Sequence, residues 1–233
     1  MPSSTLTDDA NGDALFVDDI YSAFPDGLDA RARIEKIDEI RAGAGDDIVD
    51  LTSQRFEYVG DGMTVRGGLG DEDIWANKGN NLLFGDTGND RIVGASGDDV
   101  IVGGAGNNTL HGGGGNDIFT FGLAWGTDTI EQLAGGIFLL WFDGIARDDL
   151  SLSADDNGNA VLSNDTNKVT LLGVKQVDIS QVFASGNNDL LDGLSLRFGN
   201  DGSEQYSDLS AKGAFEGFRS EKIFEDKNNG MLA

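Results

Sequence analysis

The sequence predicts an all-β protein built from very short strands that stack on one another. Two observations support this prediction. Glycine contributes 35 of the 233 residues and is concentrated between residues 60 and 126, and the same region has a nine-residue period. Such a period is typical of repeat architectures. From Gly67 to Thr120 the frame reads, without a gap, GGLGDEDIW, ANKGNNLLF, GDTGNDRIV, GASGDDVIV, GGAGNNTLH and GGGGNDIFT.

Two columns of the repeat predict a tight turn. Position four is always glycine, as expected where the backbone takes a positive φ or approaches another backbone closely. Position five is always Asp or Asn, whose side chains tolerate the left-handed region and hydrogen-bond within their own turn. Position four holds Gly70, Gly79, Gly88, Gly97, Gly106 and Gly115, and position five holds Asp71, Asn80, Asn89, Asp98, Asn107 and Asn116.

Position eight predicts the buried side of a short strand. It is always large and apolar while its neighbours have mixed polarity, so one residue of each strand points inward. A strand this short cannot bury its apolar side chain alone, whereas stacked copies bury a continuous ladder. Stacking is therefore required, and a flexible glycine-rich linker is disfavoured because it needs no apolar column. The column consists of Ile74, Leu83, Ile92, Ile101, Leu110 and Phe119.

Position six places acidic and amide side chains in register on the stacked turns. The chain has 41 acidic against 16 basic residues and a net charge of −25, so stacked carboxylates without a counterion would repel one another. A hard cation with about six to eight oxygen ligands, drawn from carboxylates and from carbonyls of the glycine-rich turns, fits calcium better than magnesium or zinc. The column consists of Glu72, Asn81, Asp90, Asp99, Asn108 and Asp117.

The pattern is similar to GGxGxDxUx, the consensus of the RTX (repeats in toxin) family, in which U is a large apolar residue. The similarity covers residues 67–120 and an isolated copy, AGAGDDIVD, at residues 42–50. The resemblance implies a right-handed parallel β-roll, which is a two-sheet β-helix of nonapeptide repeats. Two successive repeats form one coil, so repeat n stacks on repeat n+2. Turns 67–72, 85–90 and 103–108 are then on one side, and turns 76–81, 94–99 and 112–117 on the other.

The resemblance also implies which residues bind calcium between stacked turns. Aspartates at position six are the best side-chain ligands. Glu72 is one methylene longer than the consensus aspartate, and Asn81 and Asn108 lack its charge, so sites that use these three should be weaker or partly occupied. The implied metal-site residues are Asp47, Gly70, Glu72, Asn81, Gly88, Asp90, Gly97, Asp99, Gly106, Asn108, Gly115, Asp117 and Asp128.

The segments before the repeats are expected to open the roll. The isolated copy begins 25 residues before Gly67, which is not a multiple of nine, so an insertion interrupts the roll. Residues 60–65 resemble a degenerate turn and strand with Asp61 as a candidate extra ligand, and Leu51–Val59 is expected to bulge out. Arg31–Ile40 is expected to be the opening strand. The predicted divisions are a lead-in at 1–41, the roll at 42–130 and a C-terminal β-rich cap at 131–233.

After the repeats, WGTDTI at residues 125–130 is similar to the segment that closes many RTX rolls. Four apolar segments then alternate with the turn signals DDNGN and NDTN, which predicts a short antiparallel meander. DDNGN lacks the glycine and glutamate spacing of an EF-hand, so a hairpin turn is the better interpretation. Residues 209–233 either hold the uncleaved signal that directs type I secretion in this family or form the last packed segment. The four apolar segments are IFLLWF, DLSLS, AVLS and KVTLLGV.

Composition and motifs exclude several classes of function. The chain has no cysteine, and therefore no disulfide, zinc thiolate site or cysteine nucleophile. Its negative charge opposes binding to nucleic acid and to anionic lipid. The longest apolar stretch, Ile137–Phe142, is far shorter than the roughly 20 residues that cross a bilayer. His111 is the only histidine and occupies an outward strand position, so no HExxH site or catalytic triad is predicted.

These observations predict a noncatalytic calcium-binding module of a secreted or surface bacterial protein, such as an adhesin, that folds on calcium binding after type I export. The N-terminus has no basic and apolar secretory signal, which agrees with that route. The alternative is an accessory substrate-binding module of an extracellular polysaccharide-modifying enzyme. The expected partners are calcium ions and either a glycan or a neighbouring domain of a larger surface protein, without nucleic acid or membrane insertion.

The two outer faces of the roll are predicted to differ. The even repeats present an almost entirely apolar face, which marks a packed interface. We expect it to be covered by the chain's own flank, either Ile137–Val174 or Leu15–Phe24, with a partner or neighbouring domain as the alternative. The outward residues are Asp73, Trp75, Arg91, Val93, Thr109 and His111 in odd repeats, and Leu82, Phe84, Val100, Val102, Ile118 and Thr120 in even repeats.

Overall fold

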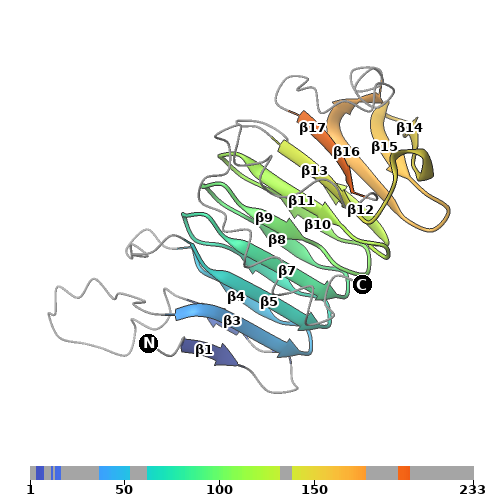
Figure 1. The fold of residues 1–233 in the computed structure, drawn as a ribbon. Helices are drawn as coiled ribbons and strands as arrows, with labels where there is room; N and C mark the ends of the chain where they lie inside the picture. The colour runs from blue at the N-terminus through green and yellow to red at the C-terminus, as the bar shows by residue number, and fades with distance from the viewer. Residues whose placement is uncertain are drawn as a thin grey trace, which may run out of the picture.

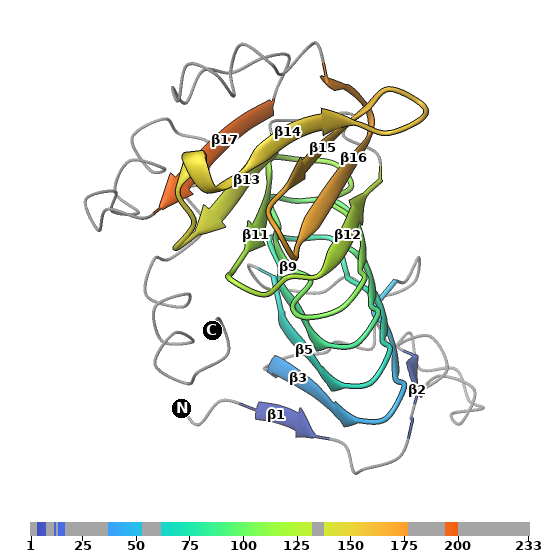
Figure 2. The ribbon, with the colours of Figure 1, turned by 90° about the vertical axis from the view of Figure 1, so that its right-hand side faces the viewer.

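A computed structural model describes residues 4–7, 12, 14–16, 37–52, 62–131, 138–176 and 194–199. The described chain forms two sheets that face each other, and successive short strands up to residue 154 alternate between them (Figures 1 and 2). Sheet A has eight strands and sheet B has nine. In sheet order, sheet A contains β1 (Ser4–Thr7), β3 (Ile37–Ala44), β5 (Thr64–Leu69), β7 (Leu82–Thr87), β9 (Val100–Val102), β11 (Asp117–Phe121), β13 (Phe138–Asp143) and β17 (Leu194–Gly199). Sheet B contains β14 (Ser151–Ala154), β15 (Asn159–Ser163), β16 (Lys168–Lys175), β12 (Thr127–Ile130), β10 (Thr109–His111), β8 (Arg91–Val93), β6 (Asp73–Trp75), β4 (Ile48–Asp50) and β2 (Ala14–Phe16).

The register confirms the predicted parallel β-roll with two repeats per coil. β6 pairs with β8 in parallel, with Asp73 opposite Arg91, and β7 pairs with β9 in parallel, with Leu82 opposite Val100. Both pairs join residues that are two nonapeptides apart. Repeat n therefore stacks on repeat n+2, as the resemblance implied.

The position-eight column forms the interior of the roll, as predicted. Each of its six side chains is fully buried. The same core extends beyond the repeats, to Val49 and Val65 at the N-terminal end and to Ile130 and Leu140 at the C-terminal end. Trp125 is 2% exposed and packs edge-on against Phe121 and Phe142, so an aromatic cluster fills the core where the repeats end.

The isolated N-terminal copy continues the roll without a break. β3 pairs in parallel with β5, and β4 pairs in parallel with β6, so the insertion between these coils leaves the stack intact. The expectation that it interrupts the roll was therefore wrong, because strands can stack in register whatever length of chain joins them. Residues 37–40 are strand, as predicted for Arg31–Ile40, while residues 31–36 and 53–61, including Asp61, lie outside the described part. β1 and β2 pair with β3 and β4 in the same parallel manner.

The C-terminal flank is only partly the predicted meander. β14, β15 and β16 pair antiparallel, and Asp155 closes the β14–β15 hairpin by accepting hydrogen bonds from the N–H groups of Asn157 and Asn159. IFLLWF differs, since β13 joins sheet A in parallel between β11 and β17. The physical reason is that β13 buries apolar side chains on both of its faces, as a strand inside a parallel sheet does. Among the described residues, no helix is long and apolar enough to cross a membrane.

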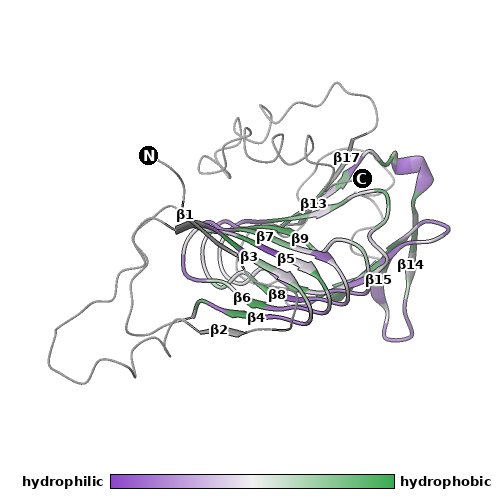
Figure 3. Ribbon diagram, turned by 90° about the horizontal axis from the view of Figure 1, so that it is seen from below, coloured by the Kyte–Doolittle hydropathy of each residue, from purple (hydrophilic) through white to green (hydrophobic). Residues whose placement is uncertain are grey.

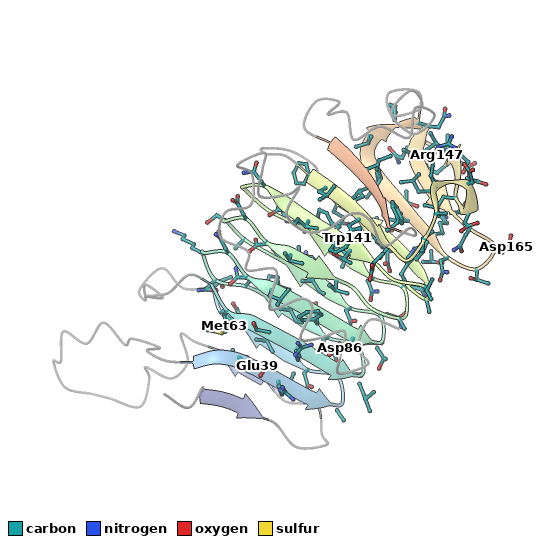
Figure 4. The ribbon with its side chains drawn as sticks, in the orientation of Figure 1. Glu39, Met63, Asp86, Trp141, Arg147 and Asp165 are labelled. Carbon is teal, nitrogen blue, oxygen red and sulfur yellow. The ribbon has the colours of Figure 1, made fainter. Side chains whose placement is uncertain are left out.

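The outer face of sheet A is buried, which confirms that the chain does not leave it exposed. Figure 3 shows hydrophobic residues along the strands of both sheets. In Figure 4, Glu39 on β3 and Trp141 on β13 mark strands next to the two end strands of sheet A. Of the suggested covering segments, β13 joins sheet A itself and adds Leu139 to this face, whereas β2 and β14–β16 belong to sheet B. Residues 17–24 lie outside the described part. The outward residues Leu82, Phe84, Val100, Val102 and Ile118 are at most 7% exposed and form a second apolar cluster with Leu139.

Candidate metal centre

The turns of the roll form two stacks that are held together by the position-six side chains. From Asp90 to Asp128, one side-chain oxygen of each of these residues accepts a hydrogen bond from the position-six N–H of the preceding turn on the same side. The bond from Glu72 N–H to Asp90 Oδ1 is 2.9 Å long, and that from Asn81 N–H to Asp99 Oδ1 is 2.7 Å. Asp128 continues one stack by accepting from Asn108 N–H at 2.9 Å. The position-six carboxylates therefore point back along the stack.

Position five forms a second ladder in the opposite direction. Asp71 Oδ1 accepts a hydrogen bond from Asn89 N–H at 2.7 Å, and Asp98 Oδ1 accepts one from Asn116 N–H at 2.8 Å. These side chains were expected to bond within their own turn, but these hydrogen bonds join each turn to the next coil. This ladder lies at the rim, where the side chains are exposed or half-buried. It joins the coils but places no carboxylate inside the stack.

The second oxygen of each position-six carboxylate is oriented toward the inside of the turn. Asp90, Asp99, Asp117 and Asp128 are 0–2% exposed, and their Oδ2 atoms accept no hydrogen bond from any described residue. Neither carboxylate oxygen of Glu72 accepts a hydrogen bond from any described residue. Because a buried polar atom without a partner is costly, this row of oxygen atoms is suited to binding a cation.

Backbone carbonyls gather at the same points. A Cβ atom on Gly94 would lie 2.4 Å from Asp99 Oδ2 and 2.4 Å from the carbonyl oxygen of Gly112 in the next coil. The equivalent distances at Gly85 are 2.1 Å to Asp90 Oδ2 and 2.5 Å to the Gly103 carbonyl. Position one is therefore glycine because a side chain would fill the space where carboxylate and carbonyl oxygens converge. The sequence analysis did not assign these glycines to the site, although glycine at position one of five of the six repeats was a usable signal.

Burial raises the pKa of the carboxylates in these stacks. The pKa of Asp99 and that of Asp128 rise to about 8, and the pKa of Asp117 rises to about 6. In all three the main cause is loss of water around the charged form, and neighbouring carboxylates add to the rise while hydrogen bonds oppose it. The pKa of Glu72 is also raised, by burial and by the adjacent Asp90. At neutral pH the roll thus favours either protonation or a bound cation.

The donor set fits calcium. The spaces at Gly85 and Gly94 each offer a carboxylate oxygen and a backbone carbonyl oxygen from the next coil. Calcium prefers oxygen ligands of this mixed kind. Within the described ranges, no group of three acidic, histidine or cysteine side chains could hold a metal by itself. Zinc, which is bound by nitrogen and sulfur side chains, is therefore a poor fit.

Besides the carboxylates described above, the predicted site residues include turn glycines, Asp47 and two asparagines. The turn glycines take positive φ, between 125° and 141° at position four of the six repeats. Asp47 is 2% exposed and continues one stack, since its carbonyl accepts a hydrogen bond from Asp73 N–H at 2.9 Å. Asn81 and Asn108 place amide groups in the stacks, and a Cβ atom on Gly103 would meet the Asn108 nitrogen at 2.7 Å. The predicted site glycines are Gly70, Gly88, Gly97, Gly106 and Gly115, and Gly79, which was not predicted as a site residue, has the same conformation.

Comparison with known proteins agrees with this geometry. A family model of the RTX calcium-binding nonapeptide repeat matches the chain in four copies, at residues 35–54, 66–101 and 93–123. A comparison with curated proteins finds no match. The matched ranges contain both the isolated copy and the continuous repeats that form the stacked turns. Residues 35–54 and 66–123 are therefore RTX calcium-binding nonapeptide repeats.

Proposed function

We propose that this chain is a noncatalytic module that folds when calcium binds between its stacked turns. The observation that carries this proposal is the row of buried position-six carboxylates, each with an oxygen that no described residue satisfies. Calcium would be held by Asp90, Asp99, Asp117 and Asp128 together with turn carbonyls, and it would supply the positive charge that the row lacks. Asp47 and Glu72 would extend the stack of Asp90 and Asp128 toward the N-terminus.

The proposed place of action is outside the cell, after type I export. Extracellular calcium modules bind with Kd values of about 10⁻⁴ to 10⁻³ M, so the submicromolar calcium of a cytosol would leave the roll unfolded. Mass action then couples folding to arrival in a calcium-rich medium. The RTX repeats support this route because proteins with such repeats are typically exported in this way.

The test is a calcium titration followed by far-ultraviolet circular dichroism, at neutral pH. We expect a cooperative gain of β structure in the millimolar range. Asp99→Ala should raise the calcium midpoint more than Asn108→Ala, because it removes a charged oxygen from the stack whereas Asn108 presents an amide. A spectrum and melting temperature that do not respond to calcium would refute the proposal. Equal midpoints for the two variants would refute the assigned role of Asp99.

A second candidate function is binding of an extracellular glycan to the outer face of sheet B. Unlike that of sheet A, this face is polar and partly exposed, and the Arg91 guanidinium lies 5.6 Å from the ring centroid of half-buried Trp75. An aromatic ring beside polar groups suits stacking on a sugar. A glycan array separates the candidates: binding that Trp75→Ala abolishes would support it, and no signal would refute it.

A further inference from the structure

Repeat 76–84 departs from the other repeats in its backbone as well as in its side chains. Its first residue is Ala76, whereas the other five repeats begin with glycine. Its second residue, Asn77, is absent from the positive-φ residues of the described chain. Position two of the other five repeats has φ between 72° and 120°. The residues with positive φ are Gly68, Asp86, Ala95, Gly104 and Gly113.

The different backbone redirects one carbonyl group. In the following turns, the carbonyls of Asp86 and Ala95 accept hydrogen bonds from the backbone of the next coil, both at 2.8 Å. The carbonyl of Asn77, at the equivalent position, instead accepts a hydrogen bond from Asn81 Nδ2 at 2.9 Å. The turn therefore directs this oxygen toward its own position-six side chain.

The amide nitrogen of Asn81 lies among four oxygen atoms from two stacked turns. From its own turn, the carbonyls of Asn77 and Gly79 are each 2.9 Å away. From the next turn, Asp99 Oδ1 is 3.0 Å away and the Gly94 carbonyl is 3.4 Å away. The amide oxygen accepts a hydrogen bond from Met63 N–H at 3.1 Å, which fixes the nitrogen end of the side chain. Asn81 is fully buried.

We propose that the Asn81 amide takes the place of a cation between turns 76–81 and 94–99. Its two N–H groups bring partial positive charge to oxygens from both turns, which is what calcium would do there, without requiring metal. The Ala76 methyl fits this arrangement, since at Gly94 and Gly112 the same position would lie 2.4 Å and 2.1 Å from a carboxylate oxygen. The contact between turns 76–81 and 94–99 then forms without calcium. In this stack calcium binds only between the turns that follow.

This inference rests on the calcium-dependent roll proposed above, and it is tested by counting calcium ions. Equilibrium dialysis with elemental analysis would compare the wild-type chain, Asn81→Ala and the double variant Ala76→Gly/Asn81→Asp. Asn81→Ala should leave the number of bound calcium ions unchanged and lower the melting temperature of the calcium-bound chain. The double variant, which restores the consensus glycine and aspartate, should bind one more calcium ion per chain.

Two results would overturn the inference. One is the loss of a calcium ion in Asn81→Ala, which would make Asn81 a ligand. The other is a folded double variant that binds no additional ion. A wild-type chain that binds no calcium would instead refute the proposed function. In that case the inference is refuted separately if Asn81→Ala melts at the same temperature as the wild type.

Discussion

Removal of calcium should make the stability of this roll depend steeply on pH. The pKa of Asp99 and that of Asp128 rise from 3.8 to about 8 in the folded chain, and that of Asp117 rises to about 6. Since one pKa unit corresponds to ~1.4 kcal/mol, ionising Asp99 or Asp128 costs on the order of 5 kcal/mol, and ionising Asp117 on the order of 3 kcal/mol. All three side chains are fully buried. Their sum is comparable to the 5–15 kcal/mol that typically stabilises a domain.

Proton linkage determines whether the stability of the metal-free chain rises or falls with pH. Because the folded pKa values lie above the unfolded value of 3.8, the folded metal-free chain binds more protons than the unfolded chain. Its stability is then fully present below the unfolded pKa and is lost as pH rises through the folded pKa values of about 6 and about 8. Calcium should reverse this dependence, since it binds the ionised carboxylates and competes with protons.

The assay is thermal melting of metal-stripped protein at about pH 5.5 and about pH 8.5, with and without millimolar calcium, which spans the titration of the buried carboxylates. Without calcium, the folded fraction and the melting temperature of any remaining transition should fall as pH rises, until the chain is unfolded at the higher pH. The stabilisation that calcium gives over the metal-free chain should be larger at the higher pH. A metal-free melting temperature that is constant or increases with pH would refute this reasoning.

A single substitution tests the same reasoning at one residue. Asp99→Asn should stabilise the metal-free chain at about pH 8.5, by up to about 5 kcal/mol, because it removes the charge that burial penalises. In calcium it should be less stable than the wild type. Asp165→Asn is the matched control, since Asp165 is an exposed aspartate outside the nonapeptide repeats (Figure 4). It should change stability by less than about 0.5 kcal/mol in either condition.

Three further predictions follow from the close approach of the coils, the buried face and the donor set. Gly88→Ala should prevent calcium-induced folding as seen by circular dichroism, because Gly88 has φ 141° and a Cβ atom would lie 1.5 Å from the Gly70 carbonyl oxygen; Gly114→Ala, which meets nothing within 4 Å, should fold normally. Val100→Asp should lower the calcium-bound melting temperature far more than Val93→Asp, because it places a charge in the buried cluster on sheet A rather than on the partly exposed face of sheet B; equal losses would contradict the assignment of the two faces. Magnesium at the same millimolar concentration should not induce folding, because it demands a regular octahedron and dehydrates reluctantly; an equal response to both ions would contradict the calcium assignment.

The sequence alone determined the period, the interior column and the calcium chemistry. These features repeat locally, so each nonapeptide carries its own turn, its own inward residue such as Ile92, and its own position-six oxygen. The 18-residue pairing then followed from the resemblance, and the register confirmed it. Residue type at fixed spacing was sufficient here because every coil solves the same packing problem.

Only the tertiary structure decided how each coil meets its neighbour. It showed that β3 stacks directly on β5 despite the insertion, that β13 joins sheet A, and that position-five side chains bond the next coil. The family resemblance implied that Asn81 is a weak ligand. The structure shows that it donates its amide hydrogens to oxygens of two turns. The physical reason is that these contacts depend on which atoms the adjacent coil presents. That arrangement is set by stacking residues distant in the sequence, and no nonapeptide specifies it by itself.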